Sequence, residues 1–310
     1  LRASTFFLAG VLVLGTDQAL IRQPMRPGRF LLPFVAQVLA LSALIWIVGA
    51  LAPGILPGHV LAAASAGLAL LTGIAGLYRS VYRLTMSLLV LQAWKAAFAT
   101  LTAALLVAGW PGSVIAPALV GTLVAWACAH CAALLVAPPA PPLEDTASSS
   151  YSSLLRVGVR FWGFALISNA LANLDQIILN LDGARDASAL YFTYSALFMP
   201  LSLFTTGFLA NMVSPYLRRR KNAFRAEARR WALSFAAAAV LLTVLSALAG
   251  FALGHAIGRF ADGVSWGLAG GMVCVAVMRF VYLVPSAILG AFGKPEERDR
   301  MLAGSTLAVL

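Results

Sequence analysis

Charged residues are scarce in this sequence. Only 11% of its 310 residues are Asp, Glu, Lys or Arg, and 61% are hydrophobic. A soluble domain is usually about a quarter charged, so the composition excludes an ordinary soluble protein. It predicts an integral membrane protein, because 310 residues provide for roughly ten spans of about 20 residues with short loops.

Acidic residues are even fewer than basic residues. There are 11 of them against 22 basic residues, which gives a net charge of +11. A soluble protein this basic would suggest nucleic acid as a partner. Here the basic clusters alternate with apolar runs, as they do when Lys and Arg are concentrated in cytoplasmic loops. We therefore expect the lipid bilayer, and no nucleic acid, as a partner.

Cysteine is also rare. The three cysteines lie in apolar runs, so a disulfide framework is not expected. Cys128, His130 and Cys131 form a C-x-H-C cluster, but no second ligand pair follows it. The cluster is better explained by small residues on a membrane helix than by a metal site.

Enzyme signatures are missing as well. The sequence has no G-x-S-x-G, Walker or G-x-G-x-x-G pattern, and no histidines or carboxylates share a helix face at metal-ligand spacing. The predicted loops are too short for a soluble catalytic domain. We therefore expect no catalytic residue, no metal site, no cofactor and no enzymatic activity.

Apolar runs and their breaks predict an all-α, polytopic helix bundle. Nine nearly complete spans and the start of a tenth are expected. The nine cover residues 4–21, 30–51, 60–78, 84–108, 114–136, 154–181, 187–217, 231–255 and 264–292. Because apolar runs lie at both ends, we expect the chain to be a fragment that lacks spans before and after it.

The loop charges predict an orientation. Basic residues follow the odd-numbered spans, whereas the loops after even-numbered spans hold almost none, only Arg185 and Arg259. This alternation places Arg22, Arg79 and the 218–230 loop, with seven Lys or Arg against one acid, in the cytoplasm. The expected location is the cytoplasmic (inner) membrane, crossed many times.

Residues 137–153 divide the chain. They hold four prolines, an acidic pair and a run of serines without apolar periodicity, which is typical of a flexible linker. The predicted organisation is an N-terminal lobe (1–136), a cytoplasmic linker (137–153) and a C-terminal lobe (154–310).

A polar stripe marks the first span of the second lobe. Asn169, Asn173, Gln176 and Asn180 recur at spacings of four, three and four, so one helical face carries all of them, with Asp175 beside it. Lipid cannot satisfy such a stripe. We expect Asn169, Asn173, Asp175 and Gln176 to line a cavity.

Two cations lie inside predicted spans. Arg279 is near the middle of 264–292, and Lys95 lies a third to halfway along 84–108. A charge at a helix centre costs about 2.5–3.5 kcal/mol on insertion scales, so both should face a water-filled cavity that suits an anionic substrate. Structural pairing, such as Arg279 with Asp175, is the alternative.

Other residues have a second explanation. Arg79 and Arg83 flank a cytoplasmic turn and are candidates for a gate, although orienting charges are the default explanation. Asp17 is expected to pair locally with Arg22. Tyr191 and Tyr194 could stack on sugar rings, but packing explains such aromatics more often.

Glycine spacing offers a further expectation. Gly250 and Gly254, like Gly267 and Gly271, lie four residues apart, and such pairs let membrane helices approach closely. They predict only a tight bundle.

One stretch resembles a known family. Residues 154–163, the segment Ser168 to Leu179 and the Leu190–Tyr191 pair resemble the start of the second half of polysaccharide flippases. These are the Wzx-like exporters of lipid-linked oligosaccharides in the MATE-like MOP superfamily. Residues 14–22 resemble the end of the family's second helix. The sequence departs from the pattern at Gln176, which is often basic in relatives, and at Ala189, where glycine is usual.

The resemblance implies twelve helices in a MATE-like two-lobe fold, of which this chain holds about nine to ten. It also implies alternating access, in which a polyprenyl-pyrophosphate-linked oligosaccharide is flipped for cell-surface polysaccharide biosynthesis. Arg279 and Lys95 would hold the headgroup, and the Asn169, Asn173, Asp175 and Gln176 group would line the sugar or ion path. Coupling to a Na⁺ or H⁺ gradient, and contact with polysaccharide polymerase or export machinery, are further implications.

Three other classes stay open. A non-transporting membrane scaffold would not require charges at helix centres. A drug or metabolite antiporter of the same superfamily would need an acidic cavity when its cargo is cationic. A membrane-embedded glycan-processing enzyme would need a large outer loop or a His/Asp motif.

Overall fold

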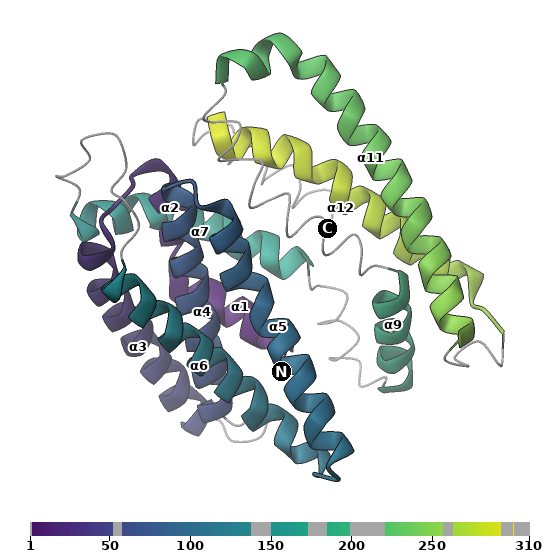
Figure 1. Ribbon diagram of the computed structural model, residues 1–310, viewed down its shortest axis with the longest axis horizontal. Helices are drawn as coiled ribbons and strands as arrows, with labels where there is room; N and C mark the ends of the chain where they lie inside the picture. Colours follow the sequence, from purple (N-terminus) through teal and green to yellow (C-terminus); the bar gives the residue numbers. More distant parts are fainter. Residues whose placement is uncertain are drawn as a thin grey trace. The chain divides into compact units, whose positions relative to one another are not determined.

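The computed structural model describes residues 2–51, 58–137, 150–172, 185–198, 221–256, 263–292 and 300. Among these residues every regular element is a helix (Figure 1), which confirms the all-α prediction. The α-helices are α1 (Arg2–Val13), α2 (Thr16–Arg22), α3 (Pro27–Leu51), α4 (Gly58–Ser80), α5 (Leu84–Val107), α6 (Ile115–Val136), α7 (Tyr151–Ala172), α9 (Arg185–Phe198), α11 (Lys221–Ala256) and α12 (Trp266–Phe292), with a short 3₁₀ helix at Gly112–Val114 before α6.

Several helices match the thickness of a bilayer. Four described helices, 27–51, 58–80, 84–105 and 112–136, are long and apolar enough to cross a membrane, and the bent pair 4–13 with 16–22 would make a fifth. They coincide with the first five predicted spans. Many large apolar side chains are exposed on them, such as Leu32 (78%) and Val107 (90%). These features indicate a membrane protein.

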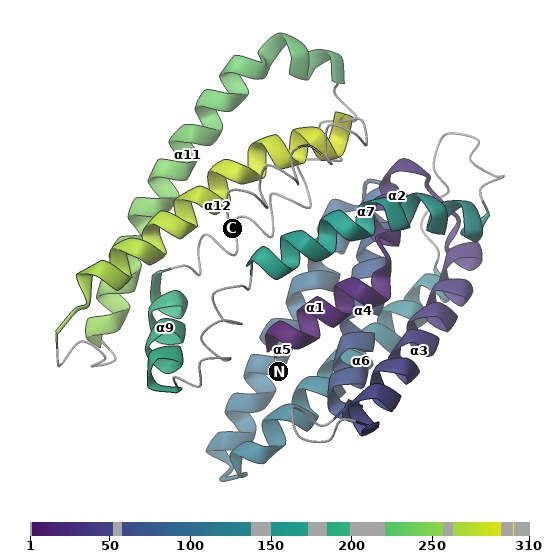
Figure 2. The ribbon, with the colours of Figure 1, turned by 180° about the vertical axis from the view of Figure 1, so that it is seen from behind.

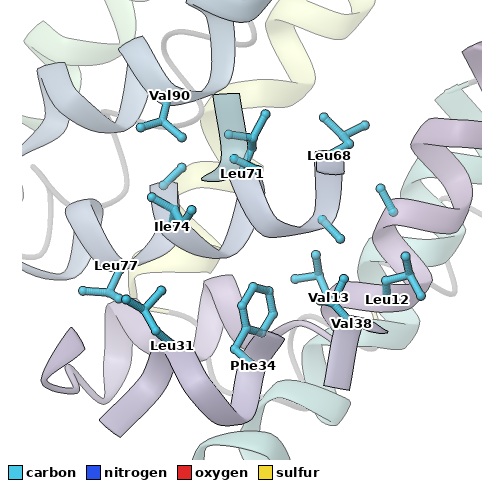
Figure 3. Packing of buried hydrophobic residues seen from close by; sticks show 14 of the residues in the cluster. Leu12, Val13, Leu31, Phe34, Val38, Leu68, Leu71, Ile74, Leu77 and Val90 are labelled. Atoms are coloured by element: carbon cyan, nitrogen blue, oxygen red, sulfur yellow. The ribbon is translucent and has the colours of Figure 1, made fainter. Parts of the chain in front are cut away.

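The chain forms two compact units, Leu1–Leu174 and Asp175–Leu310. In the first unit α4 is the central helix. In its most apolar 18-residue stretch 67% is buried, against 11–22% in the corresponding stretches of the other three spans. Figure 3 shows Leu71, Ile74 and Leu77 of α4 between Val90 of α5 and Leu31 and Phe34 of α3.

Small residues explain the central position of α4. An added Cβ at Gly67 would lie 2.9 Å from Leu123 Cβ on α6, and one at Gly76 would lie 2.8 Å from Asp17 Cα on α2. At Gly73 a Cβ would overlap the ring of Phe34. Lipid tails are as apolar as leucine, so membrane helices associate through such close packing rather than through water exclusion.

The first predicted span is not one helix. It breaks at Leu14 and Gly15, which have φ values of 49° and 68°, and α1 and α2 meet at a bend of 47°. An added side chain at Gly15 would overlap the carbonyl oxygen of Gly158 on α7. Glycine therefore serves two needs there, a left-handed backbone conformation and a close helix contact.

Helix α7 belongs to the first unit. Leu154 belongs to the buried core there, and α7 lies beside α1 and α2 (Figure 2). Partly buried Tyr151 and the buried positions Leu154, Gly158 and Phe161 recur every three or four residues, as an amphipathic helix requires. The predicted lobe boundary at 137–153 stays a prediction.

The second unit contains a smaller core from α9, α11 and α12. Its buried members are Tyr194, Leu197, Phe198, Ala269 and Met272. Helix α11 begins at Lys221, so residues 221–230, predicted as loop, are helical, which their Lys, Arg, Ala and Glu content favours.

Of the glycines predicted from spacing in the second unit, Gly250 makes a close contact among the described residues. An added Cβ at Gly250 would lie 2.8 Å from the Leu197 carbonyl oxygen on α9. By contrast, no described atom lies within 4 Å of an added Cβ at Gly267 or Gly271.

Candidate functional site

The clearest site in the described part of the first unit surrounds Lys95. This lysine lies at the middle of α5 and is exposed. It lines a cavity of about 300 Å³ together with Thr5, Phe6, Leu68, Trp94, Phe98, Leu119 and Leu123. The cavity is therefore bounded by α1, α4, α5 and α6, and most of its lining is apolar.

The local contacts of Lys95 hold its ammonium group near the cavity. Its Nζ atom donates a hydrogen bond of 2.6 Å to Gln92 Oε1, one turn earlier on the same helix. The same Nζ atom lies 5.9 Å from the centre of the Trp94 ring, within the range of a cation–π contact. A cation with an apolar wall beside it can bind an amphipathic anion, whose charged group contacts Nζ while its apolar part packs on the wall.

A buried ion pair lies at the bend of the first span. Arg79 Nη2 of α4 lies 3.0 Å from Asp17 Oδ2 of α2, and the two side chains are only 5% and 13% exposed. Asp17 Oδ2 also accepts a 2.9 Å hydrogen bond from Gln18 Nε2. Because both side chains are buried, removing either one would leave the charge of the other uncompensated at the contact between α2 and α4.

The predicted local pair of Asp17 with Arg22 is wrong. Five residues on a helix turn the chain by about 140°, so these two side chains point to different faces. Gly76 lets Asp17 approach α4, and Arg79 follows Gly76 by one turn on the same face. Arg22 instead lies 4.6 Å from the centre of the Phe161 ring on α7.

A second set of polar contacts lies at the bend of the first span. Gln37 of α3 donates a 2.8 Å hydrogen bond from Nε2 to the Leu12 carbonyl, and its Oε1 accepts a 2.7 Å bond from the Tyr151 hydroxyl. Thr16 Oγ1 donates to the Val13 carbonyl at 2.8 Å. Backbone carbonyls released by the break are thus satisfied by side chains. Burial raises the pKa of Tyr151, so its hydroxyl stays protonated and donates.

The two gate candidates differ in their surroundings. Arg79 is buried in the ion pair, whereas Arg83 is exposed at the start of the next helix. Their role as a gate stays a prediction. The structure assigns Arg79 a further contact that the sequence did not indicate.

The polar stripe lies mostly outside the described residues. Asn173, Asp175 and Gln176 are among those left undescribed, and Asn169 lies in α7 with its side chain outside the described part. Their predicted role is not tested.

Arg279 lies at the middle of α12, and its side chain is also outside the described part. Spacings of three and seven residues put its position on the same helical face as Ala276 and Met272, both of which are buried.

Two weaker candidates lie in described helices. Tyr194 is 4% exposed, stacks on Phe198 with centroids 5.8 Å apart, and accepts a 2.8 Å hydrogen bond from the Ser265 amide. Of the C-x-H-C cluster, Cys128 is exposed, and no group of three metal-ligating side chains occurs among the described residues.

The bend and its ion pair were missed from the sequence. The signal that could have found the bend is Gly15-Thr16-Asp17, a run of helix-starting residues inside an apolar segment.

No protein-family model, curated protein or solved structure matches this chain significantly.

Proposed function

We propose that this protein is a transporter of the cytoplasmic membrane that flips a polyprenyl-pyrophosphate-linked oligosaccharide by alternating access, within cell-surface polysaccharide biosynthesis. The observation that carries this proposal is the position of Lys95, a cation at the middle of an apolar 24-residue helix and at the edge of a cavity. The resemblance of residues 154–191 to polysaccharide flippases supports it from the sequence.

The argument from Lys95 is energetic. A charge at mid-membrane costs about 2.5–3.5 kcal/mol on insertion scales, and lipid cannot recover that cost. Lys95 is exposed on the first unit, so its face of α5 must meet water, a polar ligand or further protein. Pyrophosphate is a suitable ligand for an ammonium group, and the apolar wall formed by Phe6, Phe98 and Leu119 suits an isoprenoid chain beside it.

The charge distribution also favours an anionic substrate over a cationic drug. Outside residues 138–149, the sequence of the first unit holds one acid, Asp17, and its carboxylate is bound by Arg79. An antiporter for cationic drugs would need an acidic cavity, so that alternative would have to rely on acids elsewhere in the chain, such as Asp175.

A transport assay tests the proposal. The full-length protein is reconstituted into vesicles with a fluorescent lipid-linked oligosaccharide, and transbilayer movement is followed by an impermeant quencher. Lys95→Ala should slow movement by roughly ten- to a hundredfold, the value of a hydrogen bond to a charged group. Lys95→Arg should retain most of the rate, and Arg230→Ala, which removes an exposed cation of α11, serves as the control.

Accessibility tests the cavity separately. In a variant with its three cysteines replaced, Lys95→Cys should react with a membrane-impermeant maleimide. Leu101→Cys, also exposed on α5 but not part of the cavity lining, should not react. A wild-type transport rate for Lys95→Ala, or equal labelling at the two positions, would remove the basis of the proposal.

A further inference from the structure

One end of the first unit presents a cluster of exposed arginines. Arg26 lies just before α3, Arg83 just before α5, and Arg156 and Arg160 lie on α7, and all four are exposed. We call these four residues the basic end. From it we propose a lipid-binding function that is independent of the transport proposal.

Contacts among the described residues bring these helix ends together. The Arg79–Asp17 pair joins the end of α4 to α2, and the rings of Phe30 and Tyr151, 6.1 Å apart, join the starts of α3 and α7. The Arg83 amide donates a 2.9 Å hydrogen bond to the Tyr78 carbonyl, which folds the turn after α4 back onto that helix.

The basic end carries an excess of positive charge. Outside residues 138–149, Asp17 is the one acid in the sequence of this unit. Its carboxylate is already bound by Arg79 and Gln18. The surface therefore suits an anion, and guanidinium groups match the oxygens of a phosphate in pairs.

The arginines adjoin exposed apolar and aromatic side chains. Val159, 47% exposed, lies between Arg156 and Arg160, and Tyr82, 49% exposed, precedes Arg83. Tyrosine is enriched at the level of the headgroups. Two of the spans, 27–51 and 58–80, also begin or end beside these arginines, so the basic end lies where a helix leaves the hydrocarbon.

Helix α7 shows how the contact would be made. Its apolar face is already used, because Leu154 and Phe161 are buried within the first unit. The opposite face carries Arg156 and Arg160, one turn apart, with Ser152 and Ser153 exposed before them. This face can touch the membrane through its charges and hydroxyls but has no large apolar stripe to insert.

We infer that the basic end binds the phosphate headgroups of anionic phospholipids in the leaflet that it faces. Polybasic segments next to membrane spans bind such lipids electrostatically. Bound lipid then holds the start of α7, and through Gly158 and Gly15 the bend of the first span, against the bilayer surface.

Lipid retention by the full-length protein tests this inference. The protein is purified in a mild detergent, titrated with phosphatidylglycerol or phosphatidylcholine, and bound lipid is counted by native mass spectrometry. The wild type should prefer phosphatidylglycerol. Arg156→Gln with Arg160→Gln should weaken that binding by roughly thirtyfold, which corresponds to the loss of two surface-proximal basic residues. Ser152→Ala with Ser153→Ala leaves the charge unchanged and should weaken binding far less.

Two outcomes would overturn the inference. One is equal retention of phosphatidylcholine and phosphatidylglycerol by the wild type. The other is phosphatidylglycerol binding by the double arginine variant that matches the wild type, provided that the variant's helical content by circular dichroism is unchanged. Lys95→Ala should bind phosphatidylglycerol like the wild type while losing transport, so failure of one proposal is distinguishable from failure of the other.

Discussion

Replacing either member of the buried ion pair between Asp17 of α2 and Arg79 of α4 should lower the free energy of unfolding strongly. Their atoms lie 3.0 Å apart, and the side chains are 13% and 5% exposed, so neither charge is well hydrated. Removing one member of a buried ion pair costs about 3–5 kcal/mol, mostly because the other charge is left uncompensated. Since Asp17 keeps some exposure and a hydrogen bond from Gln18, we expect about 3 kcal/mol for either single replacement.

The test is a double-mutant cycle with Asp17→Asn, Arg79→Gln and the combined variant. The free energy of unfolding is measured by reversible denaturation in mixed micelles. Each single variant should lose about 3 kcal/mol. The combined variant should lose far less than the sum, because no uncompensated charge remains, which gives a coupling of at least about 1–2 kcal/mol.

Arg83→Gln is the matched control, because Arg83 lies four residues after Arg79, beyond the end of α4, and is exposed. It should change the free energy of unfolding by less than about 0.5 kcal/mol. If the losses of the two single variants add up to that of the combined variant within about 0.5 kcal/mol, Asp17 and Arg79 are not energetically coupled. That result would refute the reasoning from the buried ion pair.

Two further changes probe the packing around the bend. Gly76→Ala should cost about 1–3 kcal/mol in the free energy of unfolding, because the new Cβ would lie 2.8 Å from Asp17 Cα. The control Gly121→Ala, with no described atom within 4 Å of its Cβ, should be neutral or stabilising. Equal effects of the two substitutions would contradict the close approach of α2 to α4 at Gly76. Tyr151→Phe should cost about 1–3 kcal/mol, because Gln37 Oε1 loses its 2.7 Å donor; unchanged stability in the same denaturation assay would show that this bond is not needed.

The span positions were predictable because bilayer thickness limits them. An apolar helix of about 20 residues crosses the hydrocarbon, and the ends of such runs are visible in sequence. The run 84–108 accordingly matches α5, and 114–136 matches α6, to within a residue or so. The described part of the second unit fits less well at 221–230, where a basic segment is helical and a charge-based boundary misplaced the start of α11.

The bend was not predictable from hydropathy. Leu14 and Gly15 lie within the run 4–21, which hydropathy marks as one span even though Thr16, Asp17 and Gln18 follow the break directly. What turns the chain there is tertiary: the Gly15 backbone meets Gly158 of α7, from a segment more than a hundred residues later. The partner of Asp17 depends in the same way on how α2 crosses α4. In the sequence the only local sign of that crossing is Gly76, one turn before Arg79.

The site was predictable in part, and for a physical reason. Lys95 stood out because a cation at mid-helix is costly in lipid wherever the fold puts it. Which surface it faces depends on how α1, α4 and α6 surround α5, and the cavity beside it is a property of that packing. The polar stripe, from Asn169 to Gln176, carries an equally local signal, and its predicted role awaits the same kind of three-dimensional test.

The two charge sites described in the first unit follow one rule with opposite consequences. A charge in lipid persists when protein neutralises it or when the fold gives it access to water or a ligand. Asp17 and Arg79 satisfy the first condition, since each is the other's counter-ion and both are buried, so they belong to the framework. Lys95 is exposed at a cavity and contacts Gln92 and Trp94 on its own helix. Its exposure at the cavity gives it access to water or a ligand, so Lys95, rather than the buried ion pair, is the residue at which an anionic substrate should be sought.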